Sequence, residues 1–166
     1  MDKQEVSRLF HAYKDDVYRL ALSYLCSRQD AEDICQTVFL QLLETDVTLF
    51  PGKEKAWLLT CTANRCKSQL RSLRRHRQEP LDEAFVISRE EDRQVLAAVM
   101  ALPPKYRIPI HLFYFEGYSQ EQIAGILNLT RTNVQTRMAR ARAMLRKELT
   151  EYDESLFPPD GRSDTL

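Results

Sequence analysis

The sequence predicts an all-α protein of two small helical domains joined by a flexible acidic linker. Only four glycines occur among 166 residues, and no alternating β-branched run suggests a strand. Apolar residues recur every three to four positions through most of the chain, as in amphipathic helices. An acidic stretch at 78–90, which contains a proline, separates two such regions. We therefore predict domains at 1–77 and 91–149, followed by an acidic tail at 150–166.

The first domain opens with two predicted helices. Residues 6–25 carry apolar side chains on one stripe with helical periodicity, and residues 27–30 interrupt that stripe. Asp30 can accept hydrogen bonds from free backbone N–H groups, and it is expected to N-cap a second helix. That helix is expected to end near Leu43, with its apolar side turned inward.

A loop and a third helix complete the first domain. Residues 45–53 contain Pro51 and Gly52, which favour a turn. The third helix is expected to run from about Glu54 to about Arg75. Its apolar side is expected to consist of Trp57, Leu58, Cys61 and Leu70.

The second domain begins with two apolar helices. The first, at 91–102, must end before Pro103 and Pro104, which cannot continue it. The second, at 106–115, would place Pro109 in its first turn, where the missing N–H costs little. Gly117 is expected to close it in a left-handed conformation.

A helix-turn-helix follows. Ser119 and Gln122 have the spacing of a capping box, which predicts a short helix at 120–127. A turn at 128–130 leads to a last helix at 131–149, with Thr130 as its N-cap. Apolar residues of this helix form a seam that can pack on the preceding helix: Val134, Met138, Ala141 and Leu145.

The face of the last helix opposite the seam is polar and basic. In a helix-turn-helix, the N-terminal half of the second helix reads the major groove. Arginine can contact guanine and glutamine can contact adenine, while basic residues further along, such as Arg142, suit phosphates. This outward face holds Arg131, Thr132, Gln135, Thr136, Arg137 and Arg140. An ordinary basic helix of a bundle is the alternative.

Charge is distributed in blocks although the formal net charge is zero. Residues 61–77 and residues 130–147 each carry six basic and no acidic groups. Two such blocks separated by acidic residues predict two phosphate-facing surfaces. The alternative is two solvated helix faces, but these usually mix in acids that pair with neighbouring bases. The acidic linker and tail could shield the blocks in the free protein.

The first basic block differs from the second in its neighbours. Trp57, Thr60, Asn64 and Ser68 lie on or beside one face of the third helix, which then ends in arginines. An aromatic ring and small polar groups near basic residues suit unstacked, single-stranded bases. Trp57 taken alone is equally consistent with a core residue.

Other function classes find little support. The four cysteines lack the spacing of a zinc site and are interpreted as structural, with redox sensing or metal binding as alternatives. The three histidines are isolated, and His111 is expected to be partly buried. No nucleophile–base pair, metal cluster or phosphate-binding glycine loop indicates an enzyme, so no catalytic residue, metal or cofactor is expected. The absence of a long apolar run and of a signal-peptide pattern predicts a cytoplasmic protein without membrane insertion.

Four motifs resemble bacterial RNA polymerase sigma factors. Residues 30–40, DAEDICQTVFL, resemble the family's D-A-E-D-hydrophobic-x-Q-E-x-F segment, and AWL at 56–58 with Asn64 resembles the stretch after it. LPPKYR at 102–107 with FEGYSQEQIA at 115–124 looks like L-P-x-x-x-R followed by E-G-x-S-x-x-E-I-A. VQTRMARAR at 134–142 is similar to V-K-S-R-L-x-R-A-R. With only these two regions, the chain resembles the smallest class, the extracytoplasmic-function (ECF) sigma factors.

The resemblance implies a division of labour between the domains. The first would bind the coiled coil of the polymerase β′ subunit through Asp33, Gln36, Thr37 and Leu40. It would also hold a flipped base of the −10 promoter element in a pocket fed by the loop 45–53. The −10 contacts are then predicted to be Trp57, Asn64, Arg65, Arg71, Arg74 and Arg75. The second domain would pack near the β flap and read the −35 element, and its predicted contacts are Arg131, Thr132, Gln135, Thr136, Arg137, Ala139, Arg140 and Arg142.

The chain departs from the family pattern at three positions. Thr37 replaces the usual glutamate, Ser68 a frequent aspartate, and Gln135 the usual lysine or arginine. The resemblance also implies an anti-sigma factor as a partner, besides the polymerase core and promoter DNA. A DNA-binding regulator with an N-terminal sensing domain is the main rival, and it predicts tight duplex binding without polymerase. An anti-sigma protein is disfavoured, because it would not need two basic blocks.

Overall fold

The computed structural model describes residues 1–72 and 90–149, which form seven α-helices and a π-helical segment without any strand. The all-α prediction is therefore confirmed for these residues. The chain divides into two compact units, Met1–Pro80 and Leu81–Leu166. Most of the predicted linker, Arg74, Arg75 and the predicted acidic tail lie outside the described residues.

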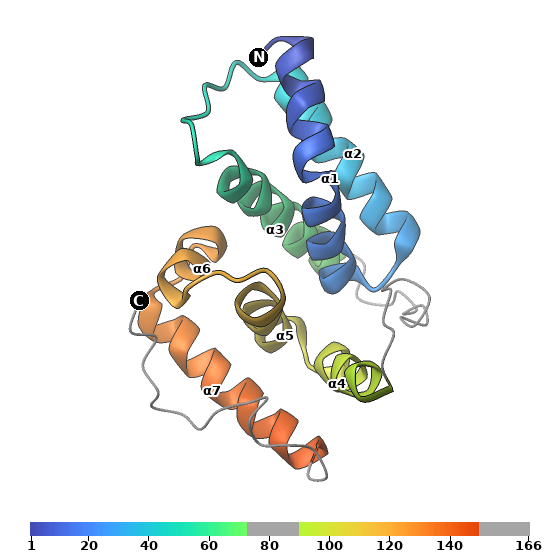
Figure 1. The fold of residues 1–166 in the computed structure, drawn as a ribbon, viewed down its shortest axis with the longest axis vertical. Helices are drawn as coiled ribbons and strands as arrows, with labels where there is room; N and C mark the ends of the chain where they lie inside the picture. Colours follow the sequence, from blue (N-terminus) through green and yellow to red (C-terminus); the bar gives the residue numbers. More distant parts are fainter. Residues whose placement is uncertain (73–89, 150–166) are drawn as a thin grey trace. The chain divides into compact units, whose positions relative to one another are not determined.

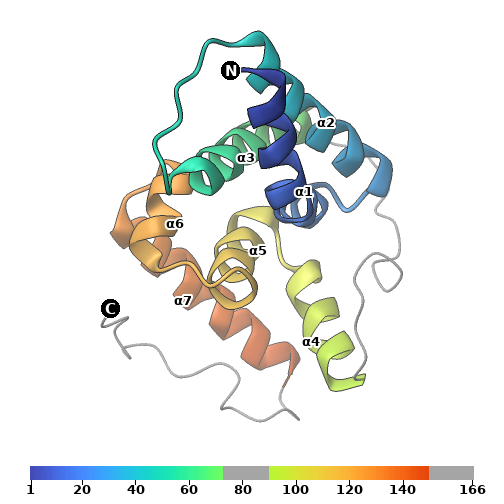
Figure 2. The same cartoon turned by 45° about the horizontal axis from the view of Figure 1, so that its top comes forward.

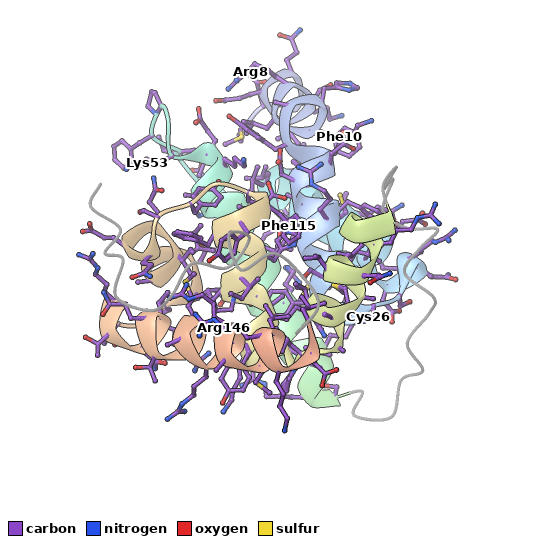
Figure 3. The ribbon with its side chains drawn as sticks, turned by 60° about the horizontal axis from the view of Figure 1, so that its bottom comes forward. Arg8, Phe10, Cys26, Lys53, Phe115 and Arg146 are labelled. Carbon is purple, nitrogen blue, oxygen red and sulfur yellow. The ribbon has the colours of Figure 1, made fainter. Side chains whose placement is uncertain are left out.

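Three helices make up the first unit: α1 (Lys3–Leu25), α2 (Arg28–Glu44) and α3 (Glu54–Ser72). Figure 1 shows α1 lying along α2 and also meeting α3, so that α1 contacts both other helices. Leucines of all three helices, including Leu20, Leu42 and Leu59, are fully buried between them. The rings of Phe10 and Phe39 meet edge to face at 5.1 Å between α1 and α2; Figure 3 marks Phe10.

The N-cap of α2 differs from the sequence prediction. Ser27, not Asp30, is the cap: its backbone is extended and its Oγ accepts a hydrogen bond from the Asp30 N–H at 3.3 Å. Asp30 instead lies in the first turn, where a carboxylate interacts favourably with the positive end of the helix dipole. Both residue types favour caps, so the sequence alone did not distinguish a helix beginning at Arg28 from a later start.

The buried face of α3 also differs from the prediction. Of the four expected apolar residues, only Leu58 is buried, whereas Trp57, Cys61 and Leu70 are half-buried. The residues packed into the core are Leu58, Leu59, Thr62, Ala63 and Cys66. Thr62 can be fully buried because its hydroxyl donates to the Leu58 carbonyl at 2.7 Å, which leaves its methyl group to pack.

The predicted loop at 45–53 is present and connects α2 to α3. Figures 1 and 2 show it standing off the three helices. Its end is a tight turn in which Lys53 N–H donates to the Phe50 carbonyl at 3.0 Å. Pro51 and Gly52 are the central residues, and Gly52 has φ +83°, as in a type II turn. The Gly52 N–H donates to the Glu54 carboxylate at 2.9 Å, which attaches the turn to the start of α3.

The second unit contains α4 (Glu90–Ala101), α5 (Pro104–Ile110), the π-helical η1 (His111–Phe115), α6 (Gln120–Leu127) and α7 (Arg131–Glu148). Figure 2 shows α5 and α6 beside the long α7, and both contact α7. A buried arginine joins α4 to α5, because Arg107 Nη1 donates to the carbonyls of Met100 and Leu102 at 3.0 and 2.8 Å.

Pro109 lies inside a helix rather than in its first turn. The helix starts at Pro104, two residues earlier than predicted, so Pro109 is an interior residue that lacks an N–H for the helical ladder. After it the backbone widens into η1, where Glu116 N–H bonds the His111 carbonyl at 3.2 Å. The predicted cap at Gly117 is confirmed by its φ of +75° and by the bond from Tyr118 N–H to the Leu112 carbonyl.

The helix-turn-helix has the predicted N-caps; α6 has the predicted boundaries, and α7 begins at Arg131 as predicted and ends at Glu148, one residue before the predicted end. Ser119 and Gln122 form both hydrogen bonds of a capping box, at 2.9 and 3.1 Å. Asn128 ends α6 in a left-handed conformation, and Thr130 Oγ1 caps α7 through the Asn133 N–H. The predicted seam is confirmed, because its four residues are each 0% exposed: Val134, Met138, Ala141 and Leu145.

Candidate nucleic-acid interface

The candidate DNA-reading face is the exposed side of α7, opposite the buried seam. The seam faces the preceding helices, so residues on the opposite side of α7 are exposed to solvent. Arg131, Thr132, Gln135, Thr136 and Arg140 are exposed, while Arg137, Ala139 and Arg142 are half-buried. All eight predicted −35 residues therefore have accessible side chains.

Hydrogen bonds orient several of these side chains. The Arg137 Nε donates to Asn133 Oδ1 at 2.9 Å, one turn earlier on α7. The Thr136 hydroxyl donates to the Thr132 carbonyl at 3.0 Å, which limits its rotation. A hydrogen bond from Arg140 and a second one from Lys105 lower the pKa of Tyr106, so α5 supplies an aromatic hydroxyl beside Arg140. Arg146, labelled in Figure 3, lies in the last turn of α7.

A second candidate surface lies on the outer side of α2. Asp33, Gln36 and Leu40 recur at helical spacing and are exposed. Leu40 is 53% exposed, and Leu43, one turn further, is 43% exposed. Asp33, Gln36, Leu40 and Leu43 form what we call the α2 outer stripe. Leu43 was not predicted from the sequence, although its spacing from Leu40 would have been enough.

Thr37 lies at the edge of that stripe, one helical turn after Asp33, and it also lines a groove between α2 and α3. The groove has a volume of about 790 Å³ and is lined by Ile34, Thr37, Gln41, Cys61, Asn64, Arg65, Ser68, Gln69 and Ser72. We call it the α2–α3 groove. Thr37, predicted to contact polymerase, and Asn64 and Arg65, predicted to contact DNA, therefore line one cavity. The sequence motifs had placed them on different surfaces.

The remaining predicted −10 residues have distinct surroundings. Arg65 reaches across the groove, where its Nε and Nη2 donate to Gln41 Oε1 at 3.2 and 2.8 Å. Arg71 donates to Ser68 Oγ at 3.2 Å. Trp57 is half-buried on α3 and does not line the groove.

Phe50 was not predicted as a functional residue, and it is the most exposed of the large apolar side chains described, at 74%. It precedes Pro51 and Gly52 in the turn that ends the loop, and it is anchored only through its backbone carbonyl. The signal for it in the sequence was an aromatic residue directly before a Pro-Gly turn. An exposed aromatic ring on a structured turn is suited to stacking on an unpaired base.

In the parts of the chain that the structure describes, the cysteines and His111 are packing residues and not members of a metal site. Cys26, Cys35 and Cys66 are buried and Cys61 is half-buried, and none of the four forms a disulfide. Burial raises the pKa of the Cys35 thiol to about 11. Burial also raises the pKa of the Cys61 thiol, so both cysteines are poor nucleophiles. The predicted burial of His111 is confirmed, and its Nε2 lies 3.4 Å from the Glu116 carboxylate. Within the described ranges, no cluster of His, Cys, Asp or Glu is arranged to hold a metal ion, and no helix is long and apolar enough to cross a membrane.

Comparisons with known proteins give the same two-part division. The family model for sigma-70 region 2 matches residues 9–76, and the one for sigma-70 region 4 matches residues 92–145. RNA polymerase sigma factor SigV of Bacillus subtilis is 30% identical over 149 residues, which cover 86% of this chain and 90% of that protein. ECF RNA polymerase sigma factor SigE of Mycolicibacterium smegmatis is 30% identical, and the match covers 87% of this chain.

The chain spans only part of some relatives. The matches cover 61% of SigE and 41% of the probable RNA polymerase sigma factor RfaY of Xanthomonas campestris, which is 31% identical over 90% of this chain. Among solved structures, CnrH in complex with the cytosolic domain of CnrY has a TM-score of 0.67 and 25% identity, covering 92% of each chain. The sigma factor RpoE of Bartonella quintana, in complex with the anti-sigma factor NepR, has a similar fold, with a TM-score of 0.72, 21% identity and coverage of 89% of this chain and 98% of that one.

Proposed function

The chain belongs to the RNA polymerase sigma factors of the sigma-70 family, in the ECF class, and from this premise we propose that it directs promoter-specific transcription initiation. It would bind the polymerase core and recognise the −10 and −35 promoter elements. The observation that carries the proposal is that regions 2 and 4 occur on one chain, each with an exposed face suited to its task. The protein would act as a specificity subunit in the cytoplasm, without catalysis of its own.

The −35 element would be read by α7. Its N-terminal half presents Gln135, Thr136 and Arg140, together with Ala139, on the side away from the core. Glutamine and arginine make bidentate contacts with adenine and guanine in the major groove, each worth about 1–3 kcal/mol of discrimination. Arg142 would contact phosphates and fix the position of the helix without reading sequence.

The polymerase core would bind the α2 outer stripe through the coiled coil of its β′ subunit. Exposed leucines flanked by polar side chains are typical of a helix that packs on a partner helix. Leu40 and Leu43 offer such an apolar centre, with Asp33 and Gln36 beside it. The β flap would contact the second unit.

The −10 element would be bound as single-stranded DNA by the first unit. Unstacking and flipping a base costs a few kcal/mol, which aromatic stacking and binding of the core enzyme would offset. Phe50 and the loop 45–53 supply an exposed ring, while Asn64, Arg71 and the half-buried Trp57 lie on α3.

An anti-sigma factor is the expected regulator. The solved RpoE structure is a complex with the anti-sigma factor NepR, and CnrH was solved with the cytosolic domain of CnrY. A protein that covers the α2 outer stripe would prevent binding of the polymerase.

Run-off transcription tests the proposal directly. Purified core polymerase and this protein are incubated with a fragmented genomic DNA library, and the transcript starts are sequenced. We expect starts that share −10 and −35 motifs and that require both proteins. Tight duplex binding by the protein alone, without transcription in the presence of core enzyme, would favour the rival DNA-binding regulator.

A further inference from the structure

We propose that Glu54 is a positioning residue for −10 recognition: its carboxylate holds the turn at 50–53 against the start of α3 and so fixes where the ring of Phe50 is presented to an unpaired base. This inference rests on the proposed function and deepens it. The sequence motifs assign no role to Glu54. In the structure, its carboxylate oxygen accepts a hydrogen bond from the Gly52 N–H at 2.9 Å.

The loop that carries Phe50 is weakly packed on the helices. None of residues 45–53 is buried. A Cβ atom placed on Gly52 would meet no atom of a non-adjacent residue within 4 Å, so this part of the turn is surrounded by solvent. Lys53, labelled in Figure 3, joins the turn to α3 through its carbonyl, which accepts from the Trp57 N–H at 3.0 Å. Packing therefore contributes little to the orientation of the turn, which depends on hydrogen bonds.

Glu54 supplies a side-chain hydrogen bond that orients the turn. The turn's own closing bond runs from the Lys53 N–H to the Phe50 carbonyl, so it does not use the N–H of Gly52. That N–H is available to a neighbouring acceptor, and the Glu54 carboxylate takes this place. Because Glu54 is the first residue of α3, its backbone is fixed by the helix. The hydrogen bond therefore fixes the turn relative to α3.

The helix end that carries Glu54 is itself held on α1. Lys55 Nζ lies 3.5 Å from Asp16 Oδ1, and the same oxygen lies 2.7 Å from Arg19 Nη2. The side chain of Asp16 is 17% exposed, so solvent screens this ion pair less than one on the open surface. A continuous set of contacts therefore connects α1, through Lys55 and Glu54, to the turn that presents Phe50.

A turn that is ordered before DNA binds lowers the cost of stacking on a base. Pro51 restricts its own φ to about −65°, and the hydrogen bond to the Phe50 carbonyl closes the turn. Once Glu54 also holds Gly52, the Phe50 ring moves mainly by rotation of its own side chain. Aromatic stacking requires a defined ring position, and ordering a loop during binding costs free energy. The hydrogen bond from Gly52 to Glu54 removes part of that cost.

A carboxylate in the first turn of a helix can also act through the helix dipole alone. Glu54 occupies such a position in α3, as Glu5 does in α1. The two explanations require different chemistry, because the dipole favours a negative charge whereas the Gly52 N–H needs an acceptor oxygen. Glutamine keeps the acceptor oxygen and removes the charge. Glu54→Gln therefore separates positioning of the turn from stabilisation of the helix.

The first test measures the motion of the turn in the full-length protein without DNA or polymerase. Backbone nitrogen relaxation is recorded by NMR for Phe50, Gly52 and Lys53 in the parent protein, Glu54→Ala, Glu54→Gln and Glu5→Ala. Glu5 is the matched control, because it is an exposed first-turn carboxylate on α1. We expect Glu54→Ala alone to lower the order parameters of the turn from about 0.85 to below about 0.6. A flexible turn in the parent protein, or an unchanged turn in Glu54→Ala, would overturn the proposal.

The second test measures −10 binding by the complex of this protein with core polymerase. The probe is a fragment of a promoter found by run-off transcription, with its −10 region unpaired. We expect Glu54→Ala to weaken binding by about threefold to tenfold, the range that corresponds to one net hydrogen bond. Glu54→Gln and Glu5→Ala should stay within about twofold of the parent protein. Equal losses in Glu54→Gln and Glu54→Ala would mean that charge matters and not the acceptor oxygen, which would overturn the proposal.

Two measurements separate this role from a general effect on the fold. Because the hydrogen bond from Gly52 to Glu54 is exposed, Glu54→Ala should keep its melting temperature within about 3 °C of the parent protein. Capture of core polymerase should also be unchanged, since that contact is assigned to the α2 outer stripe. A much larger fall in melting temperature, or a loss of polymerase capture, would make Glu54 a residue of the fold and overturn the proposal.

A double variant tests whether Glu54 acts through Phe50. When Phe50→Ala has removed the ring, adding Glu54→Ala should change binding of the unpaired −10 fragment by less than about twofold. A full additional loss in that background would mean that Glu54 acts without Phe50, and the proposal would be wrong. Failure of the parent protein to initiate at any promoter would contradict the proposed function and with it the −10 role of Glu54. The NMR comparison would still decide whether Glu54 holds the turn.

Discussion

At the scale of single residues, accessibility and local hydrogen bonds decide which side chains can recognise DNA. Arg140 is exposed on α7 and lies beside the Tyr106 hydroxyl, whose pKa it lowers, and a base or phosphate can take the place of that hydroxyl. Arg137 is bonded to Asn133 along its own helix, which directs it parallel to the surface. Phe50 is held by the backbone of its turn while its ring is exposed. These three side chains therefore differ in their local contacts, which a ligand would have to replace or could leave in place.

Arg140→Ala is expected to weaken −35-specific binding by about 1–3 kcal/mol, because a bidentate base contact is lost. Binding of the polymerase core should be unchanged, since that contact is assigned to α2. Run-off transcription and duplex competition with a mutated −35 element measure the effect. Lys147→Ala, at an exposed position near the end of α7, is the control and should weaken all duplexes alike. An equal loss of polymerase binding in Arg140→Ala would contradict the assignment.

Phe50→Ala is expected to reduce promoter opening, because stacking of a base on an aromatic ring contributes about 1–3 kcal/mol. Thermal stability should hardly change, since the ring is 74% exposed and packs on little. Permanganate footprinting of unpaired thymines in the −10 region measures opening. Phe50→Tyr preserves the ring and should retain most of the activity. Full opening with Phe50→Ala would remove this residue from the −10 site.

At the scale of secondary-structure elements, α2 and α7 each have one exposed face and one face that packs on neighbouring helices. On α2, the outer stripe is exposed, while Thr37 and Gln41 face α3 across the groove. On α7, the seam is fully buried, and the recognition residues lie opposite it. Because residues three or four apart share a helix face, Thr37 borders both the outer stripe and the groove, whereas the α7 seam and the recognition residues lie on opposite sides.

Combining Asp33→Ala with Gln36→Ala is expected to lower affinity for the polymerase core by removing polar contacts next to the exposed leucines of the outer stripe. Binding to a −35 duplex should be unchanged, because that site lies on α7. Leu40→Ser tests the apolar part of the stripe, and as Leu40 is 53% exposed, its stability cost should be small. Pull-down of core polymerase measures all three substitutions. Undiminished polymerase capture would contradict the proposed surface.

Met138→Ala and Gln135→Ala separate stability from recognition on α7. Met138 is fully buried in the seam, so its truncation is expected to destabilise the second unit by about 2–5 kcal/mol. Gln135 is exposed, and its loss should leave stability within about 0.5 kcal/mol while weakening −35 binding. Chemical denaturation and duplex binding are measured for both variants. A large stability loss in Gln135→Ala would show that this side chain supports the fold.

At the scale of the whole molecule, two units with different tasks share a chain whose formal net charge is zero. The positive charge is concentrated in two blocks, 61–77 and 130–147, with acidic residues elsewhere. Each DNA site can bind weakly and still function if the polymerase holds both units on one promoter. Once one unit has bound its promoter element, the effective concentration of the other unit at its own element is raised.

The double variant Phe50→Ala with Arg140→Ala tests this two-site arrangement. The residues lie in different units, so their losses in promoter binding by the polymerase complex should add within about 0.5 kcal/mol. Open-complex formation is measured for the parent, the two single variants and the double variant. A coupling energy well above that value would mean that the two units do not contact the promoter independently.

The sequence by itself determined the features that depend on near neighbours in the chain. The capping box at Ser119, the cap at Thr130, the left-handed Gly117 and the seam of α7 were all predicted and confirmed. Each is set by residues within about one or two helical turns, where hydrogen bonds and periodicity are visible in the sequence. The family motifs were visible for the same reason. The choice between Ser27 and Asp30 failed because both residues have cap chemistry.

Only the tertiary structure decided which faces the helices of the first unit present. It showed that α3 buries Leu59 and Cys66 rather than Trp57 and Leu70, and that Thr37 shares a groove with Asn64 and Arg65. These relations join residues more than twenty positions apart, and they depend on how α1, α2 and α3 pack together. Local periodicity predicts that a helix has an apolar side. Which residues are buried in the core and which stay exposed to a ligand depends on how the neighbouring helices pack on it.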